Sequence, residues 1–178
     1  MISSKESIGK ILFTEKDIRE KAKELGEKIS KDYEGESLVL LGALKGSILW
    51  MADLMKEITL DTEIDFIQAS SYGSGTSSSG VVKVTKDVSM DLYNKNVLII
   101  EDIVDTGITL SFIKEYLADR NPKSVKICTM LDKPSRRVAD IQAEYVGFTV
   151  DDLFIVGYGL DFDQKYRDLP YISYLESE

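Results

Sequence analysis

Histidine is absent from all 178 residues, and cysteine occurs only once, as Cys128. Without histidine the chain cannot build a Ser-His-Asp triad, a Cys-His pair or a His-ligated zinc site. A single cysteine excludes an internal disulfide framework and a multi-cysteine metal centre. We expect Cys128, which stands in an apolar segment, to be a packing residue. Acid–base chemistry must therefore come from Asp, Glu, Lys or Tyr side chains.

Long apolar runs and an excess of positive charge are also lacking. No apolar run approaches the roughly 18 residues of a membrane span, and residues 1–10 lack the apolar segment of a signal peptide. The 22 basic against 31 acidic residues give a net charge of −9, which disfavours nucleic acid and membrane surfaces as partners. Hydrophobic residues make up 43%, and the length suits one domain. We expect a soluble, cytoplasmic, single-domain protein.

Apolar residues recur at helical spacing in some segments and form short continuous runs in others. Helices are predicted over 14–31, 47–58 and 108–118, and strands over 37–44, 62–71, 97–101 and 125–131, with further extended segments near 81–84, 143–148, 154–158 and 172–175. This order predicts an α/β fold, with a mostly parallel sheet flanked by helices. Ligands bind such sheets at the carboxyl ends of the strands, so the turns after Leu44, Glu101, Leu131 and Val156 should meet at one cleft.

Several local details accompany this prediction. Thr14 and Asp17 have the spacing of a capping box at the start of the first helix. Ser47 is expected to cap the second helix, which would bury the face formed by Ile48, Met51, Ala52 and Met55. Residues 1–10 are expected to form a loose arm. Residues 70–80, with six Ser and three Gly, are expected to form a mobile loop.

The most informative segment is 97–110, VLIIEDIVDTGITL. At the start of the predicted helix, the backbone N–H groups of Thr106, Gly107 and Ile108 have no partner within the helix, and such a terminus favours an anion. Gly107 has no side chain to prevent close approach, and the hydroxyls of Thr106 and Thr109 add donors. The segment therefore predicts a phosphate cradle.

Three acidic residues stand in the same segment. Glu101 and Asp102 would repel phosphate, but carboxylates suit sugar hydroxyls, or Mg²⁺ through water. Asp105 could accept a proton. The alternative is that Asp105 only caps the helix and that the acid pair is a solvated strand end.

This segment resembles the diphosphate-sugar binding motif of the type I phosphoribosyltransferases. From about Ile11 to Tyr174, the chain is similar to the short bacterial hypoxanthine-guanine family within that superfamily. Leu44-Lys45-Gly46 resembles the family's pyrophosphate loop, in which Leu and Lys are joined by a cis peptide. Ser71-Tyr72 matches the family's lid pair, and Lys133 matches the lysine that contacts the base. Phe154–Tyr158 matches the base-stacking strand. Leu160-Asp161 and Tyr166-Arg167-Asp168 match the stretch that binds metal and pyrophosphate.

The resemblance implies transfer of a phosphoribosyl group from phosphoribosyl pyrophosphate to hypoxanthine or guanine, with Mg²⁺, in a homodimer or homotetramer. It implies one domain over 1–178, with a core of about 35–158, a hood from both terminal segments and a flexible lid. The implied substrate-binding residues are Lys45, Gly46, Ser71, Tyr72, Glu101, Asp102, Asp105, Thr106, Gly107, Ile108, Thr109, Lys133, Phe154, Ile155 and Arg167. Asp105 is the implied catalytic base, and the implied metal site consists of Glu101, Asp102 and Asp161.

Taken singly, several of these residues have ordinary alternatives. Lys45-Gly46 could be a plain strand-to-helix turn, Lys133 a surface lysine and Phe154 a core residue. Asp161 and Arg167 could each belong to a surface ion pair. Arg136 and Arg137 could touch a neighbouring subunit or lie in a solvated turn.

Basic residues found in some relatives just before the lid pair have no counterpart here, where Gln68-Ala69-Ser70 stand. Two other functions also stay open. One is phosphoribosyl transfer to xanthine or another base, and the other is a non-catalytic regulator that senses phosphoribosyl pyrophosphate.

Overall fold

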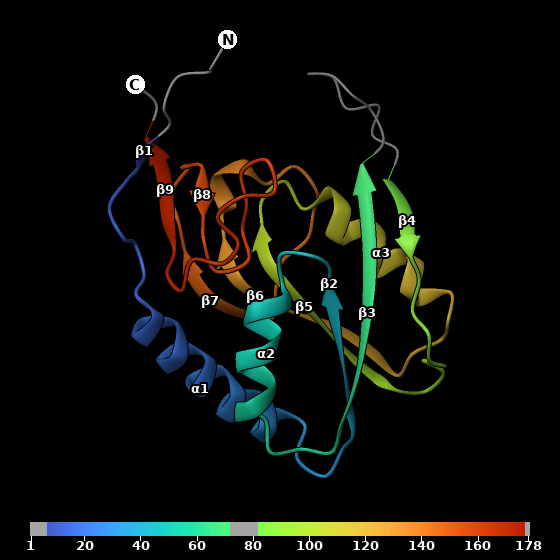
Figure 1. Cartoon of the computed structure of the whole chain (residues 1–178). Helices are drawn as coiled ribbons and strands as arrows, with labels where there is room; N and C mark the ends of the chain where they lie inside the picture. The colour runs from blue at the N-terminus through green and yellow to red at the C-terminus, as the bar shows by residue number, and fades with distance from the viewer. Residues whose placement is uncertain (1–6, 72–81, 177–178) are drawn as a thin grey trace.

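The computed structural model describes residues 7–71 and 82–176, and its centre is a six-stranded sheet. The strand order is β4-β3-β2-β5-β6-β7, and all neighbours are parallel except β3 and β4. The bounds are β2 Leu38–Ala43, β3 Thr62–Ser71, β4 Val82–Lys86, β5 Asn96–Val104, β6 Ser124–Asp132 and β7 Tyr145–Thr149. Figure 1 shows the carboxyl ends of β2, β3 and β5 at the same, upper end of the sheet. The predicted fold class is confirmed.

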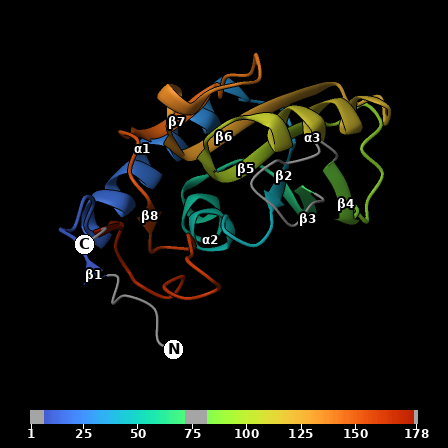
Figure 2. The same ribbon diagram turned by 90° about the horizontal axis from the view of Figure 1, so that it is seen from above.

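Helices cover both faces of this sheet. The helices α1 Glu15–Asp32 and α2 Ile48–Glu57 pack on one face, and α3 Ile108–Ala118 packs on the other; α2 and α3 lie on opposite sides in Figure 2. Alternate side chains of a strand point to opposite faces, so Leu98 packs under α2 and Ile99 under α3. Burial on both faces explains why the central strands are continuously apolar in sequence.

A second sheet joins the two terminal segments. Its order is β1-β9-β8, with β1 Ser7–Ile8, β8 Ile155–Val156 and β9 Ser173–Glu176. Ile8 pairs with Leu175, and the Gly9 N–H donates to the Tyr174 carbonyl at 2.8 Å. The expectation of a loose arm is therefore wrong for residues 7–10, because a partner strand 160 or so residues away supplies their hydrogen bonds.

The start of α1 is as predicted, whereas the start of α2 is not. Thr14 and Asp17 form a reciprocal capping box. The Ser47 hydroxyl does not cap α2; it donates backwards to the Ala43 carbonyl at 2.7 Å. The prediction for Ser47 is wrong because its backbone already has helical dihedral angles, which leave the hydroxyl facing the preceding turn.

The buried face of α2 also differs from the prediction. It consists of Trp50, Met51 and Leu54, whereas Ile48 and Ala52 are exposed. The helix carries apolar residues around most of its circumference, so periodicity alone does not select a face. Packing against α1 and the sheet makes that choice.

β5 is longer than predicted, whereas β3 has its predicted bounds and includes the first two residues of the predicted mobile loop. β5 continues through Glu101 to Val104, where Ile103 pairs with Leu131 of β6, so the acid pair lies within the strand. Ser70 and Ser71 end β3, paired with Lys83 and Val82. The rest of the predicted mobile loop, 72–80, lies outside the described residues. In the parts of the chain that the structure describes, no helix has the length and apolar character needed to cross a membrane.

Candidate active site

The connection from β5 to α3 surrounds a small cavity of about 110 Å³. Gly107 is the N-cap residue of α3, with φ of +81°, and no side chain caps the helix. A Cβ at Gly107 would lie 2.6 Å from Ile141 Cγ2, so both the conformation and the space require glycine. The lining residues are Glu101, Ile103, Val104, Asp105, Thr106, Gly107, Thr109 and Leu110. Backbone N–H groups without side-chain caps make this cavity a binding site suited to phosphate.

Asp105 does not cap α3, which removes the alternative considered from the sequence. Its Oδ1 is buried and lacks a hydrogen-bond partner, although Arg136 Nε lies 3.3 Å away. Asp105 lines both the small cavity and a larger one of about 460 Å³. A carboxylate oxygen with spare acceptor capacity therefore stands where the two cavities meet.

The larger cavity has the features of a site for a flat polar ring. It is lined by Ile103, Asp105, Lys133, Arg136, Asp152, Leu153, Phe154, Ile155, Leu160 and Asp161. Lys133 is only 6% exposed, and its ammonium donates to the Leu153 carbonyl at 2.8 Å, so it is not an ordinary surface lysine. Phe154 is 55% exposed and meets the Phe162 ring edge-on at 5.5 Å, so it is not a core residue. An ammonium and an available aromatic face thus line one cavity.

A third cavity, of about 250 Å³, lies beside the β2–α2 turn. Its lining residues are Ala43, Leu44, Lys45, Gly46, Ala69, Glu101, Asp102, Thr109, Ile113, Asp161 and Arg167. The Leu44–Lys45 peptide is cis, as the resemblance implied. A Cβ at Gly46 would lie 1.6 Å from Asp102 Oδ2, and a Cβ at Gly159 would lie 2.0 Å from the Gly46 carbonyl oxygen. Gly46 is therefore enclosed between β5 and the segment after β8.

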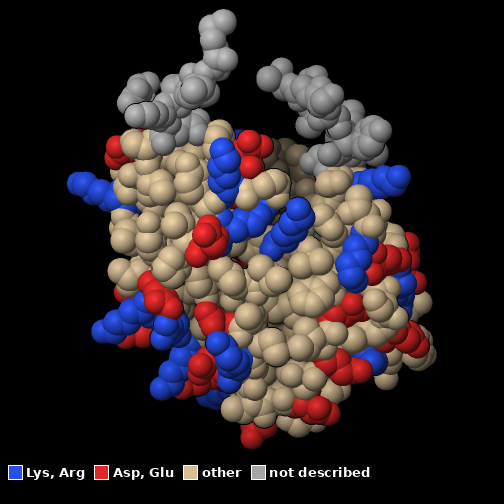
Figure 3. Space-filling model, in the orientation of Figure 1, with Lys and Arg blue, Asp and Glu red and all other residues tan. Residues whose placement is uncertain are grey.

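Basic side chains converge on this third cavity. Arg167 donates to the Gly159 carbonyl at 2.6 Å and pairs with Asp161 Oδ1 at 2.8 Å. The amide oxygen of Gln164 accepts from both Lys45 Nζ and Arg167 Nη2, each at 3.3 Å. Figure 3 shows basic side chains gathered among acidic ones in the upper middle of the face below the grey segments. Two cations sharing one oxygen acceptor suit a polyanionic ligand.

The acid pair lies in a costly electrostatic environment. Burial, together with the negative charge of Asp102, raises the pKa of Glu101 well above its ordinary value, and burial also raises the pKa of Asp102. Asp102 Oδ1 accepts from the Ile103 N–H at 2.7 Å. A bound cation or hydroxyl donors would stabilise the ionised forms of these two carboxyl groups.

The fit of Mg²⁺ can be judged from the same carboxylates. Glu101, Asp102 and Asp161 all line the third cavity, but Asp161 already pairs with Arg167 and accepts the Gln164 N–H at 2.8 Å. Within residues 7–71 and 82–176, no cluster of three or more His, Cys, Asp or Glu side chains is arranged to hold a metal. This donor set fits an ion such as Mg²⁺ that arrives with oxygen ligands from a substrate.

The three cavities share lining residues and therefore lie next to one another. Asp105 joins the first two, Glu101 and Thr109 join the first and third, and Asp161 joins the second and third. Of the residues expected from the sequence, Tyr72 and the Ser71 side chain lie outside the described residues. Ile108 is exposed and lines none of these cavities; its N–H lies 3.5 Å from the Thr106 hydroxyl.

Four contributors were not assigned from the sequence: Arg136 and Asp152, which line the larger cavity, Gln164, and Arg137, which lies beneath the phosphate cradle. Arg136 and Arg137 follow Lys133 in the same turn, and this proximity to a predicted base-binding residue was the signal in the sequence that could have assigned them to the site. Cys128 is fully buried, and burial raises its pKa to about 12, in keeping with its predicted packing role.

An α/β fold with adjacent cavities suited to a phosphate, a polyanion and a flat ring is typical of enzymes that join phosphorylated sugars to bases. Residues 8–163 match the phosphoribosyl transferase domain family. A hypoxanthine-guanine phosphoribosyltransferase of Staphylococcus aureus (strain Mu50 / ATCC 700699) is 52% identical over 168 residues, or 94% of each chain. That of Bacillus subtilis (strain 168) is 49% identical over 172 residues, covering 97% of this chain and 96% of the relative. The chain therefore belongs to the phosphoribosyltransferase family.

The solved structures agree with this assignment. A crystal structure of a hypoxanthine phosphoribosyltransferase from Staphylococcus aureus has a TM-score of 0.92 and 51% identity, covering 95% of this chain and 92% of that one. A hypoxanthine-guanine phosphoribosyltransferase from Bacillus anthracis has a TM-score of 0.91 and 48% identity, covering 96% and 100%.

Proposed function

We infer that this protein is a purine salvage enzyme that transfers the phosphoribosyl group of phosphoribosyl pyrophosphate to hypoxanthine, guanine or both. The products are IMP or GMP and pyrophosphate. One observation carries the proposal: Asp105, with a buried oxygen that lacks a hydrogen-bond partner, stands between the phosphate cradle and the base cavity. A ribose 5-phosphate in the cradle would place its reacting carbon near this carboxylate.

The base is selected in the larger cavity. Lys133 donates to the 6-oxo group of the purine, while its contact with the Leu153 carbonyl keeps the ammonium oriented. A 6-amino group cannot accept in this way, which favours oxopurines. The exposed ring of Phe154 stacks on the purine, and the adjacent Ile155 contributes to the same wall.

The proton of the purine is taken by Asp105. A neutral oxopurine must lose a proton from N7 when its N9 attacks the ribose carbon. Oδ1 of Asp105 has the spare acceptor capacity for that proton, and the chain contains no histidine to replace it.

The leaving diphosphate is held by Lys45, the backbone at Gly46, and Arg167. Glu101 and Asp102 accept hydrogen bonds from the ribose hydroxyls. Glu101, Asp102 and Asp161 would hold Mg²⁺ directly or through water, and Mg²⁺ when bound neutralises charge on the diphosphate. Thr106, Gly107 and Thr109 hold the 5′-phosphate, with the backbone of Asp105. The resemblance adds the backbone N–H of Ile108, which lies next to the Thr106 hydroxyl at the start of α3.

The remaining parts of the proposal come from the resemblance. Ser71 and Tyr72 would belong to a lid that excludes water, which would otherwise hydrolyse the activated sugar. The chain would form one domain with a core of about 35–158 and a hood from the terminal segments, and would assemble as a homodimer or homotetramer in the cytoplasm.

A turnover assay tests the proposal. Purified protein is mixed with phosphoribosyl pyrophosphate and Mg²⁺, and pyrophosphate release is measured with hypoxanthine, guanine, xanthine, adenine and uracil in turn. We expect release with hypoxanthine, guanine or both, and little with adenine or uracil. Preferred use of xanthine or a pyrimidine would reassign the base. Binding of phosphoribosyl pyrophosphate without turnover on any base would identify a sensor instead.

A further inference from the structure

Three successive carbonyl groups of the phosphate cradle are hydrogen-bonded from one segment, 133–139. The Val104 carbonyl accepts from the Lys133 N–H at 2.9 Å and from Arg137 Nη2 at 3.3 Å. The Asp105 carbonyl accepts from Arg137 Nε at 3.1 Å. The Thr106 carbonyl accepts from the N–H groups of Val138 and Ala139, at 2.9 and 3.0 Å. No carbonyl in this run is left to rotate freely.

The side chain of Arg137 is itself fixed on every side. It is 16% exposed, and Nη2 pairs with the Asp132 carboxylate at the end of β6. Nη1 donates to the Ile141 carbonyl at 2.5 Å. Its aliphatic part packs against the cradle, since a Cβ at Gly107 would lie 3.0 Å from Arg137 Cδ. Arg137 therefore connects the end of β6 to the loop after β5 through both charge and packing.

Peptide geometry links these contacts to the phosphate. In a trans peptide the carbonyl of one residue and the N–H of the next point in opposite directions. Holding the carbonyls of Val104, Asp105 and Thr106 toward segment 133–139 thus turns the N–H groups of Asp105, Thr106 and Gly107 to the other side. These three residues line the 110 Å³ cavity. Donors fixed in advance bind an anion without reorganisation.

We propose that Arg137 is a positioning residue that sets the direction of the cradle's N–H groups and thereby the recognition of the ligand's 5′-phosphate. This inference deepens the proposed function and rests on it. The neighbouring Arg136 differs, because it contacts the carboxylate of Asp105 and not the backbone of the cradle. If Arg137 only supported folding, its substitution would change the affinities for ligands with and without a phosphate equally.

The test compares IMP with inosine, which differ only in the 5′-phosphate. Binding of each is measured by calorimetry to the wild type and to Arg137→Met, which keeps the aliphatic bulk and removes the donors. We expect the IMP-to-inosine affinity ratio of Arg137→Met to fall by about 10-fold or more, because charged hydrogen bonds that orient the cradle are lost. Inosine affinity should change little. A ratio equal to that of the wild type would overturn the inference.

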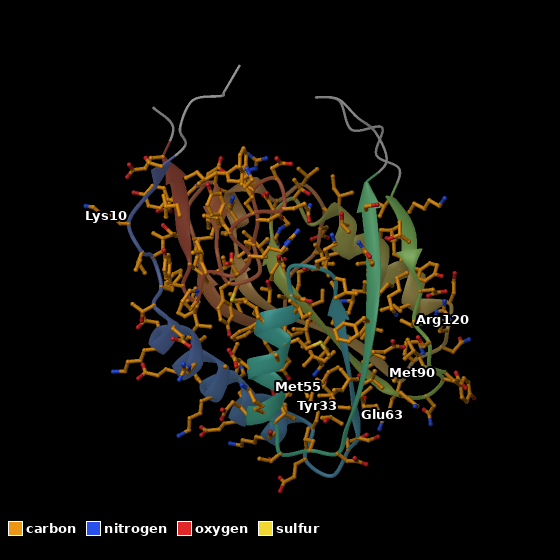
Figure 4. All side chains as sticks on the ribbon, viewed as in Figure 1. Lys10, Tyr33, Met55, Glu63, Met90 and Arg120 are labelled. Carbon is orange, nitrogen blue, oxygen red and sulfur yellow. The ribbon has the colours of Figure 1, made fainter. Side chains whose placement is uncertain are left out.

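Two further variants keep the test decisive. Asp132→Asn removes the charge partner of Arg137 while preserving shape, and should lower the ratio in the same direction; it carries the test if Arg137→Met does not fold. Arg120→Met is the matched control, because Arg120 also pairs with a carboxylate, Asp87 at 2.6 Å, but lies near the end of α3, far below the upper end of the sheet (Figure 4). The IMP-to-inosine affinity ratio of Arg120→Met should equal that of the wild type.

The same data separate this inference from the proposed function. If the wild type itself binds IMP no better than inosine, the cradle does not recognise phosphate and the proposed function fails with it. If the wild type prefers IMP and both Arg137→Met and Asp132→Asn keep that preference, only the role of Arg137 is wrong.

Discussion

The two anion sites of this molecule are built in different ways. The phosphate cradle is one continuous stretch, from the end of β5 into α3, and its donors are backbone N–H groups. The diphosphate cavity takes its residues from the β2–α2 turn, from β5 and from the segment after β8, and most of its charge comes from side chains. The donors of the cradle all come from one stretch, whose conformation segment 133–139 holds, whereas the diphosphate cavity brings together side chains of distant segments and depends on their charge balance.

This contrast predicts which substitutions affect which step. Changes near the cradle should alter chemistry or phosphate recognition without disturbing the diphosphate cavity. Changes in the diphosphate cavity should weaken phosphoribosyl pyrophosphate binding more than nucleotide monophosphate binding, because the nucleotide keeps its contacts with the cradle.

The largest effect is expected for Asp105→Asn. The variant keeps the shape of the side chain and loses its basicity, and a general base contributes roughly 10²–10⁴-fold. Turnover should fall by that order while phosphoribosyl pyrophosphate still binds, measured by steady-state kinetics and calorimetry. Near-normal turnover would remove Asp105 as the base. Loss of diphosphate binding would instead make its side chain part of the anion sites, against the distinction drawn above.

Gly46→Ala should separate the two anion sites most cleanly. The added Cβ would lie 1.6 Å from Asp102 Oδ2, so the diphosphate cavity must shift, and a displacement of about 1 Å can reduce the rate by about 10²-fold. We expect kcat/KM for phosphoribosyl pyrophosphate to fall by that order, and IMP affinity to fall less, because IMP loses a ribose contact at Asp102 and keeps its contacts with the cradle.

Gly35→Ala is the matched control for this substitution. Gly35 has a φ of +80° and no atom within 4 Å of an added Cβ, so the substitution strains the backbone away from the site. It should lower stability and leave the kinetics unchanged. An equal loss of IMP and phosphoribosyl pyrophosphate affinity in Gly46→Ala would show that the two sites are not independent.

Lys133→Met should affect neither anion site. The methionine preserves the buried packing and removes one charged hydrogen bond to the base, worth about 1.5–3 kcal/mol, or roughly 10-fold to 150-fold in affinity. KM for hypoxanthine should rise within that range, with phosphoribosyl pyrophosphate affinity unchanged. Weaker binding of phosphoribosyl pyrophosphate with an unchanged KM for hypoxanthine would contradict the assignment of Lys133 to the base.

The smallest effect concerns stability and its dependence on pH. Because burial and Asp102 raise the pKa of Glu101, its ionised form is disfavoured in the folded state. The contribution of Glu101 to stability is thus present below the ordinary carboxyl pKa of 4.5 and is lost as pH rises through the raised pKa. The Tm of Glu101→Gln relative to that of the wild type should therefore increase from about pH 5 to about pH 8.

A surface carboxylate provides the comparison for that measurement. Glu63 pairs with Lys95 at 2.7 Å on the exposed start of β3, and Figure 4 shows it at the end of the sheet opposite the site. Glu63→Gln should show no such increase with pH. A Tm difference for Glu101→Gln that does not change with pH would mean that the acid pair is not under electrostatic strain.

The same contrast explains what could be predicted from the sequence. The cradle was predicted, with α3 bounded at Ile108 and Ala118 as observed, because its glycine, threonines and helix start are neighbours in sequence. The topology predicted that the turns after Leu44, Glu101 and Val156 meet at one cleft, but the diphosphate role of this cavity came only from the resemblance. The enclosure of Gly46 by Asp102 and Gly159 could not be predicted, since it joins three distant segments. The hydrogen bonds of Arg137 to the cradle could not be predicted for the same reason. The buried face of α2 was predicted wrongly because a helix that is apolar on most sides is oriented by its neighbours.

The most direct test of the whole account is a crystal structure of the protein with IMP, pyrophosphate and Mg²⁺. The account predicts the 5′-phosphate of IMP against the N–H groups of residues 105–108, the purine between Phe154 and Lys133 with N7 toward Asp105, and pyrophosphate between Lys45-Gly46 and Arg167. Phosphate groups bound in exchanged positions, or a purine outside the Lys133 cavity, would contradict it.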